Sequence, residues 1–362
     1  MPAPGRQRHG RRGSAQLTRL ACGAKLGRMT SRASLAALIV GLALVGSGVA
    51  QAPVAPAAQI ARAADALLAT LSEAQRGQLT FTFDDEAQRK RWSNLPTGAF
   101  RRAGLRMGDL EEPQRAAVRA LLTAALSAEG YAKVMAIVEA DEQLKRSSGR
   151  AMFGRDEYYV SFVGEPSPTE PWLLQFGGHH LALNITLMGE HGTLAPSHTA
   201  AQPAVYELEG KTVRPLGREA EKAFALLDSL DAEQRKKAVL GFEIRDLVLG
   251  PGRDGQTIQP EGIKGSDLTA VQRQQLLALA AEWTGIAQGA LAAAKAAELE
   301  ANAADTWFAW SGPTERGAPA YFRIQGPTLH IEYAPQRGDP AAHIHTIYRD
   351  PTNEYGARWL TR

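Results

Sequence analysis

The sequence predicts an α+β fold made of two similar halves, each a helical pair followed by an antiparallel β-meander, with pseudo-twofold symmetry. Repeated helix starts are the first observation: the pattern Leu-x-x-x-Gln-Arg occurs at residues 71–76, 110–115, 230–235 and 268–273. The second pair of motifs follows the first at offsets of 159 and 158 residues. Matched spacing of this kind indicates an internal duplication.

The β regions provide the second observation, because residues 159–186 align without a gap on residues 307–334 at an offset of 148. The coinciding residues include Gly164 and Gly312, Pro171 and Pro319, Gly178 and Gly326, and Leu181 and Leu329. His198 and His345 correspond at an offset of 147. Chance alignment of hairpins rich in glycine and proline is the alternative explanation. We expect one duplicated domain, residues 60–362, with halves at about 60–215 and 216–362.

The individual elements follow from periodicity. Apolar residues recur every three or four positions at 60–79, 110–126 and 130–144, which predicts helices, and residues 80–83 alternate as in a short strand. Ser72 and Gln75 have the spacing of a capping box, so a second helical segment is expected to open at Ser72.

The first 50 residues have the pattern of a secretory signal peptide. An apolar run at 34–46 follows basic residues and is closed by small residues up to Ala50. A membrane anchor is the alternative, but the run is shorter than the roughly 20 residues that span a bilayer. Arg11-Arg12 leaves the twin-arginine route open beside the general secretory route. We expect a periplasmic or extracellular protein with a flexible tether at 51–59 and no stable membrane span after cleavage.

Cleavage would change the charge and the cysteine count. Residues 1–50 contain eight Lys and Arg, no Asp or Glu, and the only cysteine, Cys22. The remaining chain has 33 basic and 38 acidic residues, a net charge of −5, which gives a nucleic-acid partner no electrostatic support. Without cysteine, a metal ion would have to be bound by His, Asp, Glu or Asn.

The main candidate for a functional site is the segment His343-Ile344-His345. Two imidazoles at positions i and i+2 of an extended segment point to the same side. Such a pair can bind a metal ion, share protons or clamp a ligand, and the sequence leaves these three possibilities open.

Strand parity adds neighbours to this pair. His180 and Asn184 alternate with the apolar residues of one predicted strand, and His330 and Glu332 do so in the other. His179 shares the parity of the leucines. The two polar faces would correspond under the duplication, with Asn184 as the counterpart of Glu332.

We assign the candidate residues as follows. The metal ligands would be His180, His343 and His345, the catalytic acid–base residues Glu332 and His330, and the pocket residues His179, Asn184, Arg349 and Asp350. The ion would be a divalent transition metal: zinc, copper, iron or manganese.

Structural interpretations compete with these assignments. His330 could be a hydrogen-bonded strand residue, Arg349 could pair with Asp350 or Glu354, and Asp350 could belong to a turn. His191 and His198 lie in a loop rich in glycine and proline and are expected to be solvated.

Three functions remain open. The first is a metal-dependent enzyme, hydrolytic or oxidative, that acts on a small molecule or peptide. The second is a periplasmic protein that binds a small molecule or peptide without catalysis. In the third, the histidines close a buried hydrogen-bond network.

Four segments resemble a family of exported bacterial proteins known as a domain of unknown function. They are WSNLP (92–96), GGHHLALN (177–184), WFAWSG (307–312) and HIHTIYRDPTNEYG (343–356). The resemblance covers about residues 60–360 and implies export, with no activity to carry over. Family members continue past the last segment to a further histidine, which this sequence does not have there.

Overall fold

A mixed β-sheet dominates the structure, which is a computed structural model and describes residues 55–360; the predicted signal peptide, 1–50, lies outside the described residues. The strands of the first half are β1 (Thr80–Phe81), β2 (Leu105–Arg106), β3 (Tyr159–Val163), β4 (Trp172–Gly178), β5 (Leu181–Met188), β6 (His191–Thr193) and β7 (Ser197–Ala201). Those of the second half are β10 (Ile263–Lys264), β11 (Trp307–Ser311), β12 (Tyr321–Gly326), β13 (Leu329–Pro335) and β14 (Ile344–Arg349). A separate hairpin joins β8 (Tyr206–Leu208) to β9 (Lys211–Val213).

The strand order places the two halves side by side in one sheet. The order is β1-β3-β4-β5-β7-β14-β13-β12-β11-β10, with β2 paired to β3 and β6 paired to β5. All pairs are antiparallel except β1 with β3. The halves meet where β7 pairs with β14, and Thr199 lies opposite Thr346 there. Their hydroxyl oxygens are 2.7 Å apart, and the indole of Trp283 donates to Thr346.

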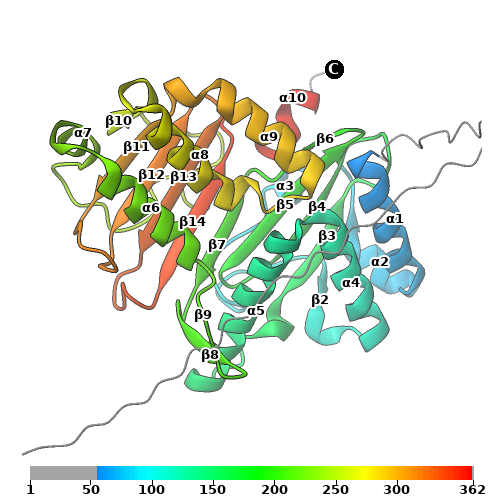
Figure 1. Cartoon of the computed structure of the whole chain (residues 1–362). Coiled ribbons are helices and arrows are strands. Elements are labelled where there is room, and N and C mark those ends of the chain that lie inside the picture. Colours follow the sequence, from blue (N-terminus) through cyan, green and yellow to red (C-terminus); the bar gives the residue numbers. More distant parts are fainter. Residues whose placement is uncertain (1–54, 361–362) are drawn as a thin grey trace, which may run out of the picture. The chain divides into compact units, whose positions relative to one another are not determined.

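Helices cover one face of this sheet (Figure 1). The α-helices are α1 (Pro56–Ala69), α2 (Glu73–Leu79), α3 (Glu86–Arg89), α4 (Glu112–Ala125), α5 (Ala128–Ser148), α6 (Gly217–Ser229), α7 (Ala232–Ala238), α8 (Ala270–Thr284), α9 (Gly289–Ala301) and α10 (Ala357–Leu360). Short 3-10 helices are η1 (Met107–Asp109), η2 (Arg155–Glu157), η3 (Gly265–Asp267), η4 (Ala303–Asp305) and η5 (Glu354–Gly356). The predicted α+β class is confirmed.

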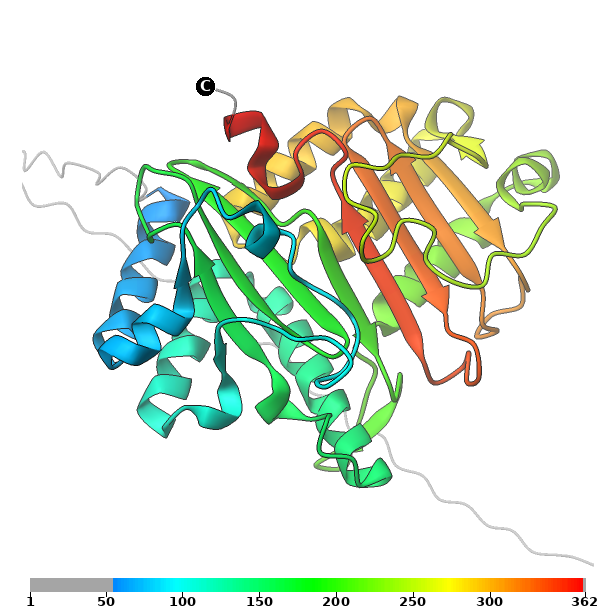
Figure 2. The ribbon, with the colours of Figure 1, turned by 180° about the vertical axis from the view of Figure 1, so that it is seen from behind.

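Long loops cross the opposite face of the sheet (Figure 2). One runs from the end of β1 to β2 and includes α3, and the other connects α7 to β10. The main apolar core lies between helices and sheet, and a second cluster lies under the loops. That second cluster contains Trp92, Leu173, Ile347 and Tyr355. The sheet is therefore buried on both faces, which accounts for the nearly continuous burial of β5 and β14.

The Leu-x-x-x-Gln-Arg motifs have the same role in both halves. In all four copies the glutamine is the N3 residue of a capping box, in α2, α4, α7 and α8. The amides of Gln75 and Gln114 also bond to each other, as do those of Gln234 and Gln272. One side chain thus caps its own helix and ties it to the neighbouring one, which explains the matched spacing.

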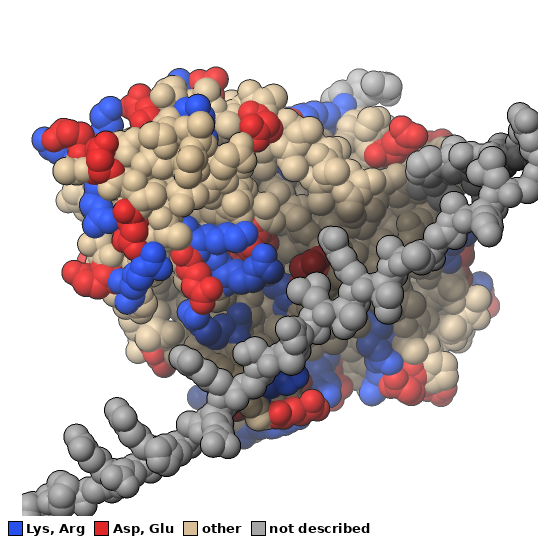
Figure 3. Space-filling view, viewed as in Figure 1, with Lys and Arg blue, Asp and Glu red and all other residues tan. Residues whose placement is uncertain are grey.

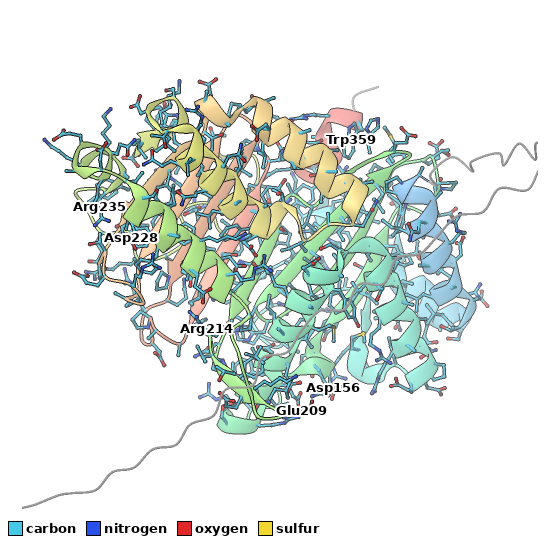
Figure 4. All side chains as sticks on the ribbon, viewed as in Figure 1. Asp156, Glu209, Arg214, Asp228, Arg235 and Trp359 are labelled. Carbon is cyan, nitrogen blue, oxygen red and sulfur yellow. The ribbon has the colours of Figure 1, made fainter. Side chains whose placement is uncertain are left out.

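The arginine of the motif binds backbone carbonyl groups. Arg235 donates to the carbonyl of Leu227 and pairs with Asp228 at 3.3 Å, and Figure 4 shows these side chains where α6 meets α7. Such contacts satisfy carbonyl groups at the end of the preceding helix.

The second helical segment opens at Ser72 as predicted, because Thr70 ends α1 and Ser72 caps α2. Other boundaries differ from those predicted. Helix α1 begins at Pro56, so residues 56–59 of the predicted tether are helical. The strand predicted at 80–83 ends at Phe81.

Acidic and basic side chains alternate on the helical face, with a less charged area over α8 and α9 (Figure 3). Among residues 55–360, no helix has both the length and the apolar character needed to cross a bilayer.

Candidate metal centre

Three imidazoles converge at the seam between the halves. Nε2 of His343 is 3.0 Å from Nε2 of His180 and 2.9 Å from Nε2 of His345. One ring nitrogen from each of the three lies within 4.8 Å of the others. Tetrahedral ligation at about 2.0–2.1 Å separates two nitrogens by roughly 3.3 Å, and the two distances from His343 Nε2 are within a few tenths of an ångström of that value.

The three rings are neutral in the folded protein. Burial, with the neighbouring histidines, lowers the pKa of His180 and of His345 well below the usual histidine value. Burial also lowers the pKa of the half-buried His343 to about 4. Neutral imidazole is the form that ligates metal ions, so protons would not compete for this site at neutral pH.

Hydrogen bonding among three neutral rings is incomplete. His343 Nε2 carries either one proton or one lone pair, so it cannot make a well-directed bond to two nitrogens at once. A cation at the centre would accept a lone pair from each ring. The arrangement therefore suits an ion better than a hydrogen-bond network.

His345 is held by the strands and by the loop that follows α3. It stands on β14 opposite Ala334 on one side and Ala200 on the other, and these small neighbours leave room for the ring. Its Nδ1 is 3.3 Å from the side-chain amide of Asn94. A ligated His345 carries its proton on Nδ1, so the Asn94 amide would then turn its oxygen to that nitrogen.

The WSNLP segment, which contains Asn94, is fastened to the β4–β5 turn. Arg102 donates to the carbonyl oxygens of Ser93, Leu95 and Gly178 at 2.6–2.7 Å. One guanidinium group thus connects the loop beside His345 with the turn that carries His180.

His179 and His180 form this turn, rather than lying on a strand as predicted. His180 has a φ of 65°, a left-handed conformation that histidine adopts more readily than most residues. Strand parity therefore does not apply to His180, although the structure brings it to the predicted partners. The preceding Gly178 has no room for a side chain, since a Cβ there would be 2.9 Å from the ring of Tyr158.

His330 and Glu332 form a separate polar cluster and are not part of the three-histidine group. Glu332, fully buried, accepts hydrogen bonds from the backbone of Val248 and Leu249, from Tyr321 and from His330, at 2.6–2.9 Å. Burial alone would raise the pKa of Glu332, but His330 and the backbone donors outweigh it and the pKa lies below its usual value. Glu332 therefore anchors the loop between α7 and β10.

The predicted pocket residues make contacts within the protein. Asn184 bonds to Gln175 and to the carbonyl of Pro196. A cavity of about 30 Å³ adjoins Asn184, enough for about one water molecule.

The other two polar residues near the C-terminus are also paired. Arg349 binds two backbone carbonyls and pairs with Glu354, as its structural interpretation expected. Asp350 pairs with Lys295 at 2.7 Å.

His191 and His198, both expected to be solvated, differ in their burial. His191 is exposed as expected. His198 was expected to be solvated, but this is wrong: it lies on β7 and is fully buried. Pairing of β7 with β14, which is distant in the sequence, causes this burial. The local content of glycine and proline does not indicate such a pairing.

Comparisons with known proteins give one match. A family model described as "Protein of unknown function (DUF3500)" matches residues 54–357. No curated protein and no solved structure matches. The matched region contains all the elements that build the histidine cluster, and the chain belongs to the DUF3500 family of proteins of unknown function.

Proposed function

We propose that the protein is an exported metal-dependent enzyme, hydrolytic or oxidative, whose divalent transition-metal ion is bound by His180, His343 and His345. The observation that carries the proposal is the convergence of three Nε2 atoms, two of whose separations are 3.0 and 2.9 Å. The lowered pKa values of the three rings also support the proposal, because neutral imidazoles have lone pairs that a cation between them could accept.

Three imidazole ligands reduce the number of metals that the site would select. Imidazole suits zinc, copper and iron, and manganese usually takes more oxygen ligands than are found here. His343 is the one half-buried member of the three, so an open coordination position would face solvent on its side. A zinc ion with three protein ligands supplies an acidified water molecule as a nucleophile.

The catalytic role of His330 and Glu332 stays a prediction. Both oxygens of Glu332 already accept hydrogen bonds, so a base at the histidine cluster would have to come from another group. This observation favours the second candidate function, binding of a small molecule or peptide without catalysis. The predicted pocket residues His179, Asn184, Arg349 and Asp350 would then have structural roles, since each bonds to other groups of the protein.

Metal analysis of the purified protein tests the proposal. We expect about one zinc, copper or iron ion per chain, and loss of that ion in the double variant His343→Ala/His345→Ala. His191→Ala is the matched control, because His191 is exposed and outside the cluster. A wild-type protein that binds no transition metal would refute both the site and the enzyme.

We further propose that the two halves descend from an internal duplication. The support is the paired glutamine caps in each half and the strand pairing in which Thr199 faces Thr346, its counterpart at an offset of 147. The histidine centre would then lie beside the pseudo-twofold axis, with His180 from one half and His343 and His345 from the other.

A further inference from the structure

A buried carboxylate lies behind the histidine cluster. Asp141, on α5, is fully buried, and its Oδ1 is 2.7 Å from Nδ1 of His179 and 3.5 Å from Nδ1 of His180. Within the described part of the chain, Asp141 Oδ2 and His180 Nδ1 have no hydrogen-bond partner. Two unsatisfied polar atoms that face the same small region are costly unless a further state satisfies them.

The turn between Asp141 and the cluster is rigidly held. Tyr158 donates its hydroxyl to the carbonyl of His179 at 2.9 Å, and Ala200 donates its N–H to the carbonyl of His180 at 2.8 Å. Arg102 binds the carbonyl of Gly178. The ring of His180 can therefore be oriented by a modest side-chain rotation without movement of its backbone.

The two nitrogens of His180 face different partners. Nε2 lies toward His343, and Nδ1 lies toward Asp141. An imidazole that gives the Nε2 lone pair to an ion carries its proton on Nδ1, and that N–H requires an acceptor. Asp141 is the carboxylate nearest to that nitrogen.

We propose that Asp141 is a positioning residue for the metal centre, which accepts the Nδ1–H of His180 and thereby fixes the tautomer that presents Nε2 to the ion. This inference rests on the proposed metal site. The 3.5 Å separation would shorten to a hydrogen bond when the ion draws His180 into place. His179, bonded to the same oxygen, keeps the carboxylate in its orientation.

Geometry supports this role over direct ligation of the same ion by Asp141. Oδ1 of Asp141 lies on the Nδ1 side of His180, whereas the three-histidine group forms at the Nε2 side. The same oxygen is already 2.7 Å from Nδ1 of His179.

The test compares two buried carboxylates. Asp141→Asn keeps the shape of the side chain and removes its charge; Glu219→Gln is the matched control, because Glu219 is fully buried too but bonds to Lys133. Zinc affinity is measured by competition with a chelator of known affinity. We expect Asp141→Asn to weaken zinc binding about 10- to 100-fold, and Glu219→Gln to change it less than about threefold.

A second measurement does not depend on a variant that folds. In the zinc-loaded wild-type protein, nitrogen NMR of the histidine side chains should show His180 protonated at Nδ1. A His180 ring without a proton at Nδ1, or an Asp141→Asn variant with wild-type zinc affinity, would overturn the inference and leave the metal site intact.

The stoichiometry separates the remaining outcomes. Two zinc ions per wild-type chain and one in Asp141→Asn would make Asp141 a ligand, which overturns the positioning role. A wild-type chain that binds no zinc, copper or iron would overturn the proposed function and this inference together.

Discussion

Asn184 on β5 and Glu332 on β13 correspond in the alignment of residues 159–186 with 307–334, and both are buried, but their polar atoms find different partners. Asn184 is neutral and bonds to Gln175 and to the carbonyl of Pro196. Glu332 is an acid whose carboxylate receives two backbone N–H groups from the loop after α7. A buried charge is tolerated in the second half because that loop supplies donors, and this contrast shows that the loops differentiate two otherwise similar frameworks.

The same contrast holds at the seam. His198 on β7 and His345 on β14 correspond in the alignment, and both are buried. His345 joins His180 and His343, whereas neither nitrogen of His198 has a hydrogen-bond partner among the described residues. Of these two corresponding histidines, only His345 therefore belongs to a group that could bind an ion.

The largest expected effect separates Glu332 from Asn184. Glu332→Ala would leave its donors and His330 buried without an acceptor, and we expect a loss of about 3–5 kcal/mol in the free energy of unfolding. Asn184→Ala should cost about 1–3 kcal/mol, because it strands neutral groups. Urea unfolding measures both, with exposed Glu243→Ala as a control within about 0.5 kcal/mol. Equal losses at the two positions would contradict the contrast between the halves.

Metal binding should distinguish His345 from His198. Zinc at 100 times its dissociation constant should stabilise the wild-type protein by about 2.7 kcal/mol. We expect His345→Ala to abolish this zinc-dependent gain and His198→Ala to retain it, as measured by thermal unfolding with and without zinc. Loss of the gain in both variants would mean that the seam binds its ion symmetrically.

Sequence patterns predicted those features that depend on local spacing. The capping box of Ser72 and Gln75 and the helix at 110–126 follow from side chains three or four residues apart, and the structure confirms both, with the second helix at Glu112–Ala125. His343 and His345 could be paired because an extended segment fixes their common side. The paired glutamines also left a signal, since their motif repeats at nearly equal intervals.

Contacts that depend on three-dimensional packing could not be predicted. Asp141 is one of many acids on a helix, and only the packing of α5 against the β4–β5 turn brings it to His179. Asn94 lies in a loop whose path over the sheet is set by the bonds of Arg102. Asp141 stands in no motif, and the resemblance of the WSNLP segment gives Asn94 no chemical role.

The pH dependence of the metal-free protein should report the buried His198. Burial lowers its pKa to about 3, while the unfolded chain has an ordinary histidine. The unfolded state therefore binds more protons than the folded state between pH 6 and 4. As the pH is lowered through this range, this one group reduces the free energy of unfolding by about 1.4 kcal/mol per pH unit. Above the pKa of the unfolded histidine, near 6.5, its contribution is constant.

The variant His198→Ala isolates that contribution. Urea unfolding at several pH values between 6 and 4 should give a slope lower than that of the wild-type protein by about 1.4 kcal/mol per pH unit. The variant His191→Ala provides the baseline, because His191 is exposed and lies outside the histidine cluster. Unchanged slopes in His198→Ala would show that His198 is protonated in the folded protein.

The smallest expected effect tests what the halves share. Gln114 and Gln272 each cap a helix and bond to the glutamine of the preceding motif. Each also donates to a carbonyl group at the end of a third helix, Thr70 after α1 or Ser229 in α6. Replacement of either by alanine should therefore cost a similar amount, about 1–2 kcal/mol. The double variant should lose the sum, since the two sites share no partner. A difference above about 1 kcal/mol between the single variants in urea unfolding would show that the shared motif does not carry equal weight, and would weaken the duplication that we propose.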